Sequence, residues 1–227
     1  GYEVPPKSNA NYGWILNMVS KLSENGVAGF ILANGALSGG GEEYKIRKKL
    51  IENNLVEAIL VLPQDMFYTT NISVTLWILN KNKKEQQRII GDKTRQYRNR
   101  EKEILFMDLR QMGVPFEKKY IQFSEDDIHK ITKTYHDWQT ASLPFGEGWG
   151  GAVPEFCYSA SFDEVAKKDF SLVPSKYIEF VNRDENIDFD EKMQTLQSEF
   201  AELLKAEVAS KNDLLTVFKE LGYEIKL

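Results

Sequence analysis

Two strand-length apolar segments joined by a short loop constrain the fold of this chain more than any other feature. The segments span residues 55–62 and 73–79. A segment that is apolar along its whole length is typical of a strand with other layers packed on both faces. The loop between them is too short to hold a crossover helix, so we expect the second strand to run antiparallel to the first.

Helical patterns alternate with these strands. Apolar residues from Ile15 to Leu22 recur at the spacing of one helix face, and further helices are expected at residues 42–53 and 124–138. Strands are expected at residues 27–33 and 104–108. The first of these is apolar on both faces and should be covered by helices on each side. The alternation predicts the α/β class.

The C-terminal part of the chain has a different period. Apolar residues recur there at alternating spacings of four and three, which is a heptad seam. One helix cannot bury such a seam alone, so we expect it to dock on partner helices. The alternative is an antiparallel hairpin that folds back on its own domain and is broken near residues 210–213. The residues expected to dock are Met193, Leu196, Phe200, Leu203, Leu214, Val217 and Leu221.

Residues 81–102 are locally basic in an acidic protein. Nine lysines and arginines there face three acids, whereas the whole chain has a formal net charge of −5. That net charge gives no general attraction to nucleic acid, so any DNA contact has to come from a local patch. A solvated loop is the simpler interpretation of this segment, and phosphate contact is the alternative. The candidates for phosphate contact are Lys93, Arg95, Arg98 and Arg100.

Several common chemistries lack the residues that they need. Cys157 is the single cysteine, which excludes a disulfide within the chain and fits a reducing cytoplasm, and we interpret it as a small buried side chain rather than a nucleophile. His129 and His136 are too few for a structural metal set, and we expect both to face solvent. The triple glycine at residues 39–41 runs into two glutamates, which would repel a phosphate. We therefore identify no catalytic residue and no metal ligand, and no apolar run is long enough to cross a membrane.

Five segments of the chain resemble one known family. They are the strand that ends in Asn34-Gly35, the glycine loop that runs into "KIRKKLIE", the loop "LPQDMFYTTNI", "FSLVPSKYIEF" at residues 170–180, and "FKELGYEI" near the C-terminus. In this order they resemble the methyltransferase (modification) subunit of type I DNA restriction-modification systems, an adenine-N6 methylase family. The likeness covers nearly the whole chain.

The resemblance implies a fold and an activity. The fold would be α/β, the distal half of a Rossmann-like, S-adenosylmethionine-dependent methyltransferase sheet, mixed with its last strand antiparallel, plus a C-terminal arm made of one long helix. The expected domains are the distal catalytic part at 1–140, a connecting segment at 141–185 that includes a glycine-rich loop, and a docking arm at 186–227. The activity would be transfer of a methyl group from S-adenosylmethionine to adenine in double-stranded DNA.

The family's cofactor and catalytic motifs are expected to lie before Gly1. The family binds S-adenosylmethionine with a glycine-rich turn and carries an Asn-Pro-Pro-Phe or Asn-Pro-Pro-Tyr tetrapeptide. The stretch Val4-Pro5-Pro6-Lys7 lacks both the asparagine and the aromatic residue. We therefore expect the cofactor only in a full-length protein, assign no residue here to cofactor binding, and expect this piece alone to be inactive.

The loop between the two apolar strands is the expected DNA-facing element. Methylating an adenine requires turning the base out of the duplex, and aromatic faces can stack on it. Loops at strand ends are also where an open α/β sheet places its ligand crevice. An alternative is that Phe67 only caps the core while Thr70 and Asn71 satisfy turn hydrogen bonds. The residues expected to line the cleft are Asn34, Gly35, Phe67, Tyr68, Thr69, Thr70 and Asn71.

The resemblance also implies partners. They would be the specificity subunit, which the C-terminal seam would dock against, the restriction subunit and double-stranded DNA, in the cytoplasm and without a membrane. The strand at residues 27–33 would lie beside a strand from the missing half, so its bare edge would allow a homodimer of this piece. Two rival interpretations are an α/β interaction module with no enzymatic parent and a fragment of a type II adenine methylase with its own recognition domain.

Overall fold

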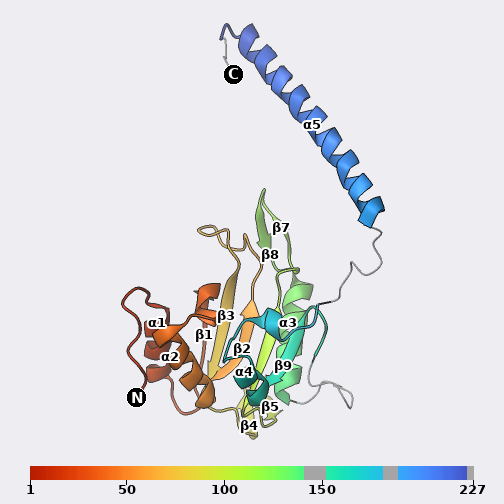
Figure 1. Ribbon diagram of the computed structural model, residues 1–227. Coiled ribbons are helices and arrows are strands. Elements are labelled where there is room, and N and C mark those ends of the chain that lie inside the picture. The colour runs from red at the N-terminus through yellow and green to blue at the C-terminus, as the bar shows by residue number, and fades with distance from the viewer. Residues whose placement is uncertain (141–151, 181–188, 224–227) are drawn as a thin grey trace. The chain divides into compact units, whose positions relative to one another are not determined.

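The computed structural model describes residues 1–140, 152–180 and 189–223 (Figure 1). The chain divides into two compact units, Gly1–Phe180 and Val181–Leu227. The first unit is built around a mixed five-stranded sheet. Its strands, in spatial order, are β1 (Val27–Ala33), β3 (Val74–Asn80), β2 (Val56–Val61), β6 (Glu103–Asp108) and β9 (Cys157–Ser161).

The strand directions confirm the inference drawn from the short loop. Strand β3 lies between β1 and β2 and runs antiparallel to both. Strands β2 and β6 are parallel, and β9 runs antiparallel to β6. Strands β1, β2 and β6 therefore end at one edge of the sheet, which we call the carboxyl edge, and begin at the opposite amino edge.

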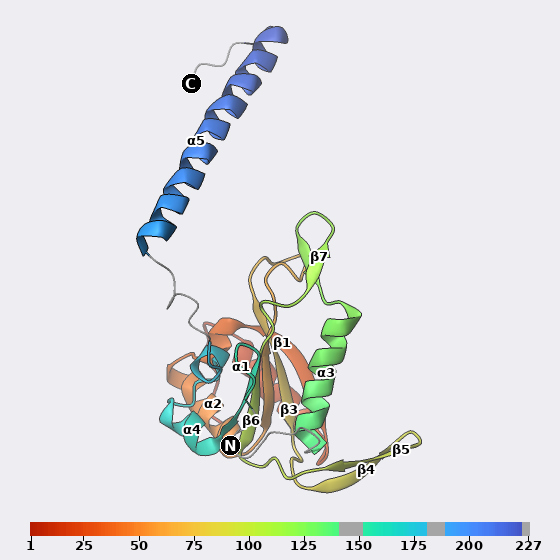
Figure 2. The same ribbon diagram turned by 90° about the vertical axis from the view of Figure 1, so that its right-hand side faces the viewer.

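Helices cover both faces of the sheet (Figure 2). One face packs against α1 (Asn11–Lys21), α2 (Gly41–Glu52) and α4 (Phe162–Lys167), and its core includes Ile15, Leu50 and Trp77. The other face packs against α3 (Glu125–Thr140), where Trp138 and Met107 are buried together. Two short 3-10 helices, η1 (Asn34–Leu37) and η2 (Pro174–Lys176), lie beside the carboxyl edge.

Strand β1 differs from its prediction. Its residues alternate between exposed and half-buried, and Val27 and Ile31 are exposed, whereas Phe30 and Leu32 pack against the core. The expectation of helices on both faces is wrong because β1 is the end strand of the described sheet and only its α1 side is covered. The apolar sequence therefore predicted the strand correctly but not which of its faces is packed by helices.

Two hairpins leave the sheet at its opposite edges. At the amino edge, β4 (Gln86–Ile90) and β5 (Lys93–Tyr97) occupy the basic segment that was expected to be a solvated loop. At the carboxyl edge, β7 (Val114–Phe116) and β8 (Tyr120–Gln122) project beyond the sheet beside the loop between β2 and β3 (Figures 1 and 2).

A buried carboxylate organises the amino edge. Glu57 accepts hydrogen bonds from Asn80 Nδ2 at 2.6 Å, Arg100 Nε at 3.1 Å and Gln139 Nε2 at 3.2 Å. Glu57 and Arg100 are almost fully enclosed. A charge in such a place is tolerated only when it is paired and hydrogen-bonded. The cluster ties β2, β3 and α3 to the strand that follows the β4–β5 hairpin.

Lys83 is buried at the same edge. Its ammonium group donates to the backbone carbonyls of Val56 at 2.9 Å and Glu103 at 2.6 Å. Burial lowers the pKa of Lys83 to about 8, although the nearby Glu57 carboxylate opposes that shift. This lysine therefore holds two neighbouring strands together at the start of the hairpin.

The segment after the undescribed residues 141–151 belongs to the sheet unit. Strand β9 pairs with β6, and helix α4 follows it with a capping box made by Ser161 and Glu164. The expected connecting segment at 141–185 therefore contains a strand of the sheet, and the unit extends to Phe180. The glycine-rich loop expected at 143–151 lies outside the described residues.

The second unit, described by itself, is helix α5 (Phe189–Glu220). It is one uninterrupted helix of 32 residues. The alternative of a hairpin broken near residues 210–213 is therefore wrong. No helix among the described residues has the length and apolarity that spanning a membrane would require.

Candidate functional site

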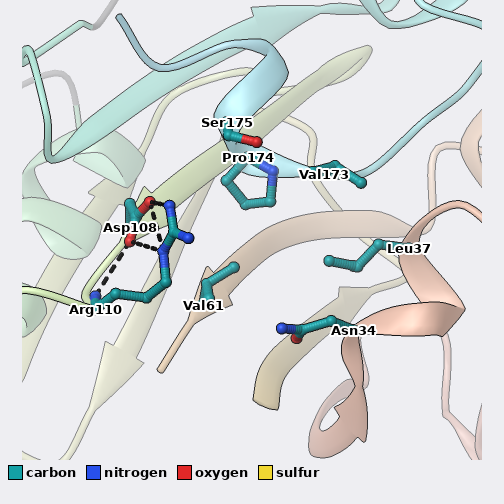
Figure 3. Close-up of a pocket in the computed structure, with 8 residues that line it drawn as sticks. All are labelled: Asn34, Leu37, Val61, Asp108, Arg110, Val173, Pro174 and Ser175. Atoms are coloured by element: carbon teal, nitrogen blue, oxygen red, sulfur yellow. Dashed lines mark hydrogen bonds and ion pairs between the residues drawn. The ribbon is translucent and has the colours of Figure 1, made fainter. Parts of the chain in front are cut away.

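A small cavity lined by both polar and apolar residues opens at the carboxyl edge (Figure 3). It has a volume of about 100 Å³ and collects side chains from four separate parts of the chain. Its position outside the ends of parallel strands is where open α/β sheets hold their ligands. The lining residues are Asn34, Leu37, Val61, Asp108, Arg110, Val173, Pro174 and Ser175.

Asn34 follows the last residue of β1 and is held in one orientation. Its Oδ1 atom accepts a hydrogen bond of 2.5 Å from the hydroxyl of Thr75, which is fully buried at the start of β3. With Oδ1 accepting this hydrogen bond, the amide nitrogen of Asn34 lies on the cavity side (Figure 3). Gly35, the next residue, is exposed at the start of η1.

Asp108 and Arg110 form the opposite wall of the cavity. Arg110 donates to both carboxylate oxygens of Asp108, with Nη2 to Oδ2 at 2.6 Å and Nε to Oδ1 at 2.9 Å (Figure 3). Asp108 is buried, while the arginine is about half exposed. The pair leaves the cavity close to neutral overall. With the Asn34 amide and the Ser175 hydroxyl, it offers donors and acceptors suited to an uncharged polar group.

The loop from Phe67 to Asn71 lies at this edge, and its residues divide into two groups. Phe67 packs against the core on the α3 face. Thr70 makes two turn hydrogen bonds, because its amide donates to the carbonyl of Phe67 and its hydroxyl accepts from the amide of Ile72. For these two residues, capping and turn formation account for the contacts. Tyr68, Thr69 and Asn71 are exposed, and Tyr68 is 67% exposed.

The glycine loop before α2 is held by a buried arginine. Arg47 donates to the carbonyls of Gly39 at 2.7 Å and Phe170 at 2.8 Å. A side chain at Gly39 would collide with the carboxylate of Glu43. The loop therefore packs closely against α2 and the segment before η2, and the carboxylate of Glu43 lies against Gly39.

The basic segment, residues 81–102, lies at the amino edge of the sheet, opposite the glycine loop and the cavity. For Arg100 the expectation of a phosphate contact is corrected, because its guanidinium is 1% exposed and paired with Glu57. Arg98 forms a bidentate ion pair with Glu103, with Nη1 to Oε1 at 2.9 Å and Nη2 to Oε2 at 2.7 Å. Its Nε also donates to the carbonyl of Trp138. Arg95 lies directly opposite Arg88 in the β4–β5 register. The side chain of Lys93 is outside the described part of the structure.

The isolated cysteine and histidines show no catalytic arrangement. Cys157 is buried in β9, and burial raises the pKa of its thiol to about 11, which opposes a role as a nucleophile. His129 is exposed as expected, whereas His136 is half-buried, and desolvation lowers its pKa. Among the described residues, no three of the His, Cys, Asp and Glu side chains lie close enough to hold a metal ion.

The expected docking seam lies on the surface of α5. Every seam residue is at least 38% exposed, including Leu196 at 46%, Leu203 at 68% and Leu221 just beyond the helix end at 66%. A single helix cannot bury an apolar stripe of this length by itself. The seven predicted residues are Met193, Leu196, Phe200, Leu203, Leu214, Val217 and Leu221.

Sequence reasoning missed several residues that the fold brings to the carboxyl edge. Asp108 is the last residue of β6 and Arg110 follows it closely, and polar residues at the end of a strand are a usable signal. Ser175 lies in "FSLVPSKYIEF", a segment that resembles the family but whose sequence alone indicates no role in a site. Tyr120 contacts Tyr68 with ring centroids 4.7 Å apart, and no local pattern predicts that contact.

The geometry defines a class of protein. An open mixed sheet with helices on both faces and a cavity outside the ends of its parallel strands is an α/β domain, the class in which loops around that edge commonly supply a ligand site. The family follows from comparison with known proteins. Residues 1–186 match the family model for N-6 DNA methylase, and the chain belongs to this family.

Two curated relatives illustrate the likeness. The methylase subunit of the type I restriction enzyme HindI from Haemophilus influenzae is 37% identical, over 98% of this chain and 46% of the relative. The corresponding MjaIX subunit from Methanocaldococcus jannaschii is 31% identical, over 97% of this chain and 36% of the relative. The chain therefore spans less than half the length of these relatives. Membership in a methylase family does not fit an interaction module with no enzymatic parent.

Solved structures share the fold. The type I methyltransferase subunit from Streptococcus thermophilus has a TM-score of 0.63 at 24% identity, over 79% of this chain and 32% of that one. The M protein of the type I enzyme EcoKI has a TM-score of 0.54 at 20% identity, over 90% of this chain and 45% of that one. The mixed sheet with helices on both faces is thus the fold expected of the family.

The residues of this chain do not make the family's expected cofactor motifs. Pro5 and Pro6 lie in an irregular segment before α1 rather than at the end of a strand, and Val4 is 80% exposed. At the carboxyl edge the glycine loop is filled by Arg47 and Glu43. We therefore assign no residue of this chain to S-adenosylmethionine and derive no chemical step through it.

Proposed function

We propose that this chain is the distal half of the catalytic domain of a type I DNA adenine-N6 methyltransferase subunit, with its carboxyl edge facing the DNA. In a protein as long as the curated relatives, the remaining sequence would supply the methyl-donor site and the catalytic tetrapeptide. The chain belongs to the N-6 DNA methylase family. The observation that carries the proposal is the cavity at the carboxyl edge, which holds the polar side chains of Asn34, Asp108, Arg110 and Ser175. The loop of residues 62–73 lies at the same edge of the sheet.

The cavity suits the approach of a base that has left the duplex. Such a base presents uncharged donors and acceptors along its edge and an apolar face for stacking. Asn34 offers an oriented amide, and the Asp108–Arg110 pair is neutral as a unit. We assign the target-base side of the cleft to Asn34, Gly35, Tyr68, Thr69 and Asn71, and restrict Phe67 and Thr70 to supporting the loop.

The basic hairpin gives a separate candidate for phosphate contact. Of the expected residues, Arg95 and Lys93 stay in this proposal, and Arg88 joins them because it lies across from Arg95 on the same hairpin face. Two like charges in direct register are unfavourable unless an anion bridges them. The hairpin lies at the amino edge, so this contact would be remote from the cleft.

The long helix would dock the subunit into its assembly. The exposed heptad seam of α5 fits helices of a specificity subunit, and the restriction subunit would join the same complex. A solved structure with a TM-score of 0.53, whose subject is complex assembly of a type I restriction-modification system, matches 96% of this chain. At 14% identity it supports the fold alone.

The test is methyl transfer to DNA by the complete subunit together with its specificity subunit, measured with a labelled methyl donor. Tyr68→Ala should lower the rate by about tenfold, because stacking on an aromatic ring is worth about 1–3 kcal/mol per base. The melting temperature should not change, since the Tyr68 side chain is 67% exposed.

The control for Tyr68→Ala is Tyr68→Phe, which keeps the ring and should keep most of the rate. An unchanged rate in Tyr68→Ala removes this residue from the cleft. Absence of any methyl transfer to adenine by the wild-type complex contradicts the proposed function itself.

A further inference from the structure

The β7–β8 hairpin carries exposed aromatic and cationic side chains that lie outside the proposed cleft residues. Phe116 and Tyr120 are register partners and therefore share one face of the hairpin. Tyr120 contacts Tyr68 edge to face, with ring centroids 4.7 Å apart and planes at 79°. Two aromatic rings from separate segments are thus in contact at the carboxyl edge, and Phe116 lies beside Tyr120 on the same hairpin face.

The hairpin is fixed to the loop and to the sheet at its base. The amide of Ile121 donates to the carbonyl of Asp65 at 3.0 Å, which joins β8 to the loop of residues 62–73. Asp127, at the start of α3, is hydrogen-bonded by Ser124 and by the backbone of Gly113. Tyr120 and the hairpin backbone therefore support the loop that carries Tyr68.

Among the described residues, several apolar side chains at this edge are exposed. Val114 is 41% exposed, Phe116 is 37% exposed and Ile72 is 59% exposed. The hairpin turn carries Lys118 and Lys119 next to Glu117, all exposed. In the part of the chain that the structure describes, neither lysine forms an ion pair, and the Lys119 ammonium lies 5.0 Å from the ring centroid of Tyr120.

Aromatic faces next to unpaired lysines match the chemistry of a nucleic acid. Rings can contact bases, and ammonium groups can contact phosphates. The hairpin extends past the sheet at the edge where the cavity opens, so a duplex that presents a base to the cavity would meet its tip (Figures 1 and 2). The charge of the turn is opposite to that of DNA, although the whole chain has a net charge of −5.

We propose that the β7–β8 hairpin is a second DNA-contacting element, in which Lys118 and Lys119 bind backbone phosphates and Tyr120 positions Tyr68 at the cleft. This inference rests on the proposed function. It assigns to Tyr120 a positioning role and to the two lysines a role in affinity, without a part in the chemical step.

The lysine test is the salt dependence of DNA binding by the full-length methyltransferase complex. Lys118→Gln with Lys119→Gln should reduce the slope of log affinity against log salt by about 0.9 for each phosphate that the variant no longer binds. The matched control is Lys45→Gln with Lys167→Gln, which removes the same charge from exposed positions on α2 and α4 and should leave the slope unchanged.

The tyrosine test is a double-mutant cycle. Tyr120→Ala should lower methylation, Tyr120→Phe should restore it because the ring remains, and Tyr68→Ala with Tyr120→Ala should be no slower than Tyr68→Ala alone. Additive losses would overturn the positioning role, because independent residues add.

The two proposals fail in distinguishable ways. If the wild-type complex methylates DNA but the lysine variant keeps the full salt slope, the hairpin inference is wrong and the proposed function stands. A lysine variant that loses affinity for the specificity subunit, with DNA binding unchanged, would assign this surface to a protein partner and overturn the inference. If the wild-type complex transfers no methyl group, the proposed function fails first.

Discussion

Two arginines, Arg100 at the amino edge of the sheet and Arg110 at the carboxyl edge, are both paired with a carboxylate but differ in burial. Arg100 is enclosed and bonded to Glu57, so its charge is neutralised inside the protein. Arg110 binds Asp108 in a two-bonded arrangement but is about half exposed at the cavity. Burial decides the difference, because an enclosed guanidinium cannot exchange its partner for a ligand, whereas a half-exposed one can.

The buried pair at the amino edge predicts a large effect on stability. Arg100→Ala leaves the Glu57 carboxylate buried without its cation, and removing one partner of such a pair costs about 3–5 kcal/mol. The measurement is urea unfolding of this chain followed by circular dichroism. Lys48→Ala is the control, because the Lys48–Glu52 pair on α2 is exposed and worth at most about 0.5 kcal/mol. Equal losses in the two variants would contradict a special role for burial.

At the scale of elements, the pattern of apolar residues and the loop lengths predicted the helices and strands that local sequence determines. Strands β2, β3 and β6 and helices α2 and α3 follow from apolar runs and helical spacing, and the short loop gave the antiparallel direction of β3. The hairpin at residues 86–97 was missed, although Gly91-Asp92 is a two-residue turn signal, because the charged composition favoured a loop. Strand β9, with its small side chains, has too weak a pattern to be recognised.

The candidate site was predictable only in part, for a physical reason. A strand-end loop with two aromatic residues indicated Tyr68 and its neighbours from local sequence. The cavity, however, joins Asn34 to Asp108 and Pro174, and the Tyr68–Tyr120 contact joins segments about fifty residues apart. These contacts depend on sheet order, and the position of β3 between β1 and β2 has no signature in either strand.

Helix α5 supports a prediction that concerns one element alone. Leu196→Asp with Leu203→Asp should abolish assembly with the specificity subunit, because both leucines lie on the exposed seam and a buried carboxylate would be unpaired. Size-exclusion chromatography with light scattering measures the assembly. Gln194→Asp with Ser198→Asp adds the same charge on the opposite face of the helix and should leave assembly intact.

The leucine substitutions should not alter the sheet unit. Helix α5 belongs to the second compact unit of the chain, so the circular dichroism and melting of the sheet unit should match the wild type. Intact assembly in the leucine variant would show that the seam is not the docking surface.

For the molecule as a whole, the most consequential feature is the end strand β1. Within the described residues it pairs only with β3, and its other side offers unsatisfied backbone groups. An exposed edge of apolar sequence recruits another strand. In the proposed full-length domain a strand from the remaining sequence would occupy this place.

The free edge predicts that the 227-residue chain self-associates. Analytical ultracentrifugation should show a weight-average mass that rises toward that of a dimer with concentration. Ile31→Lys places a charge on the exposed face of this edge and should shift the equilibrium toward monomer. A chain that stays monomeric at high concentration would contradict the prediction.

The antiparallel contact between β2 and β3 has a consequence for how such proteins diverge. The loop of residues 62–73 leaves and re-enters the sheet at neighbouring strand ends, with Leu62 bonded to Val74 at its base. Insertions or deletions between these two anchors leave the register of every strand unchanged. Lineages can therefore vary the length and chemistry of this surface while inheriting the same scaffold.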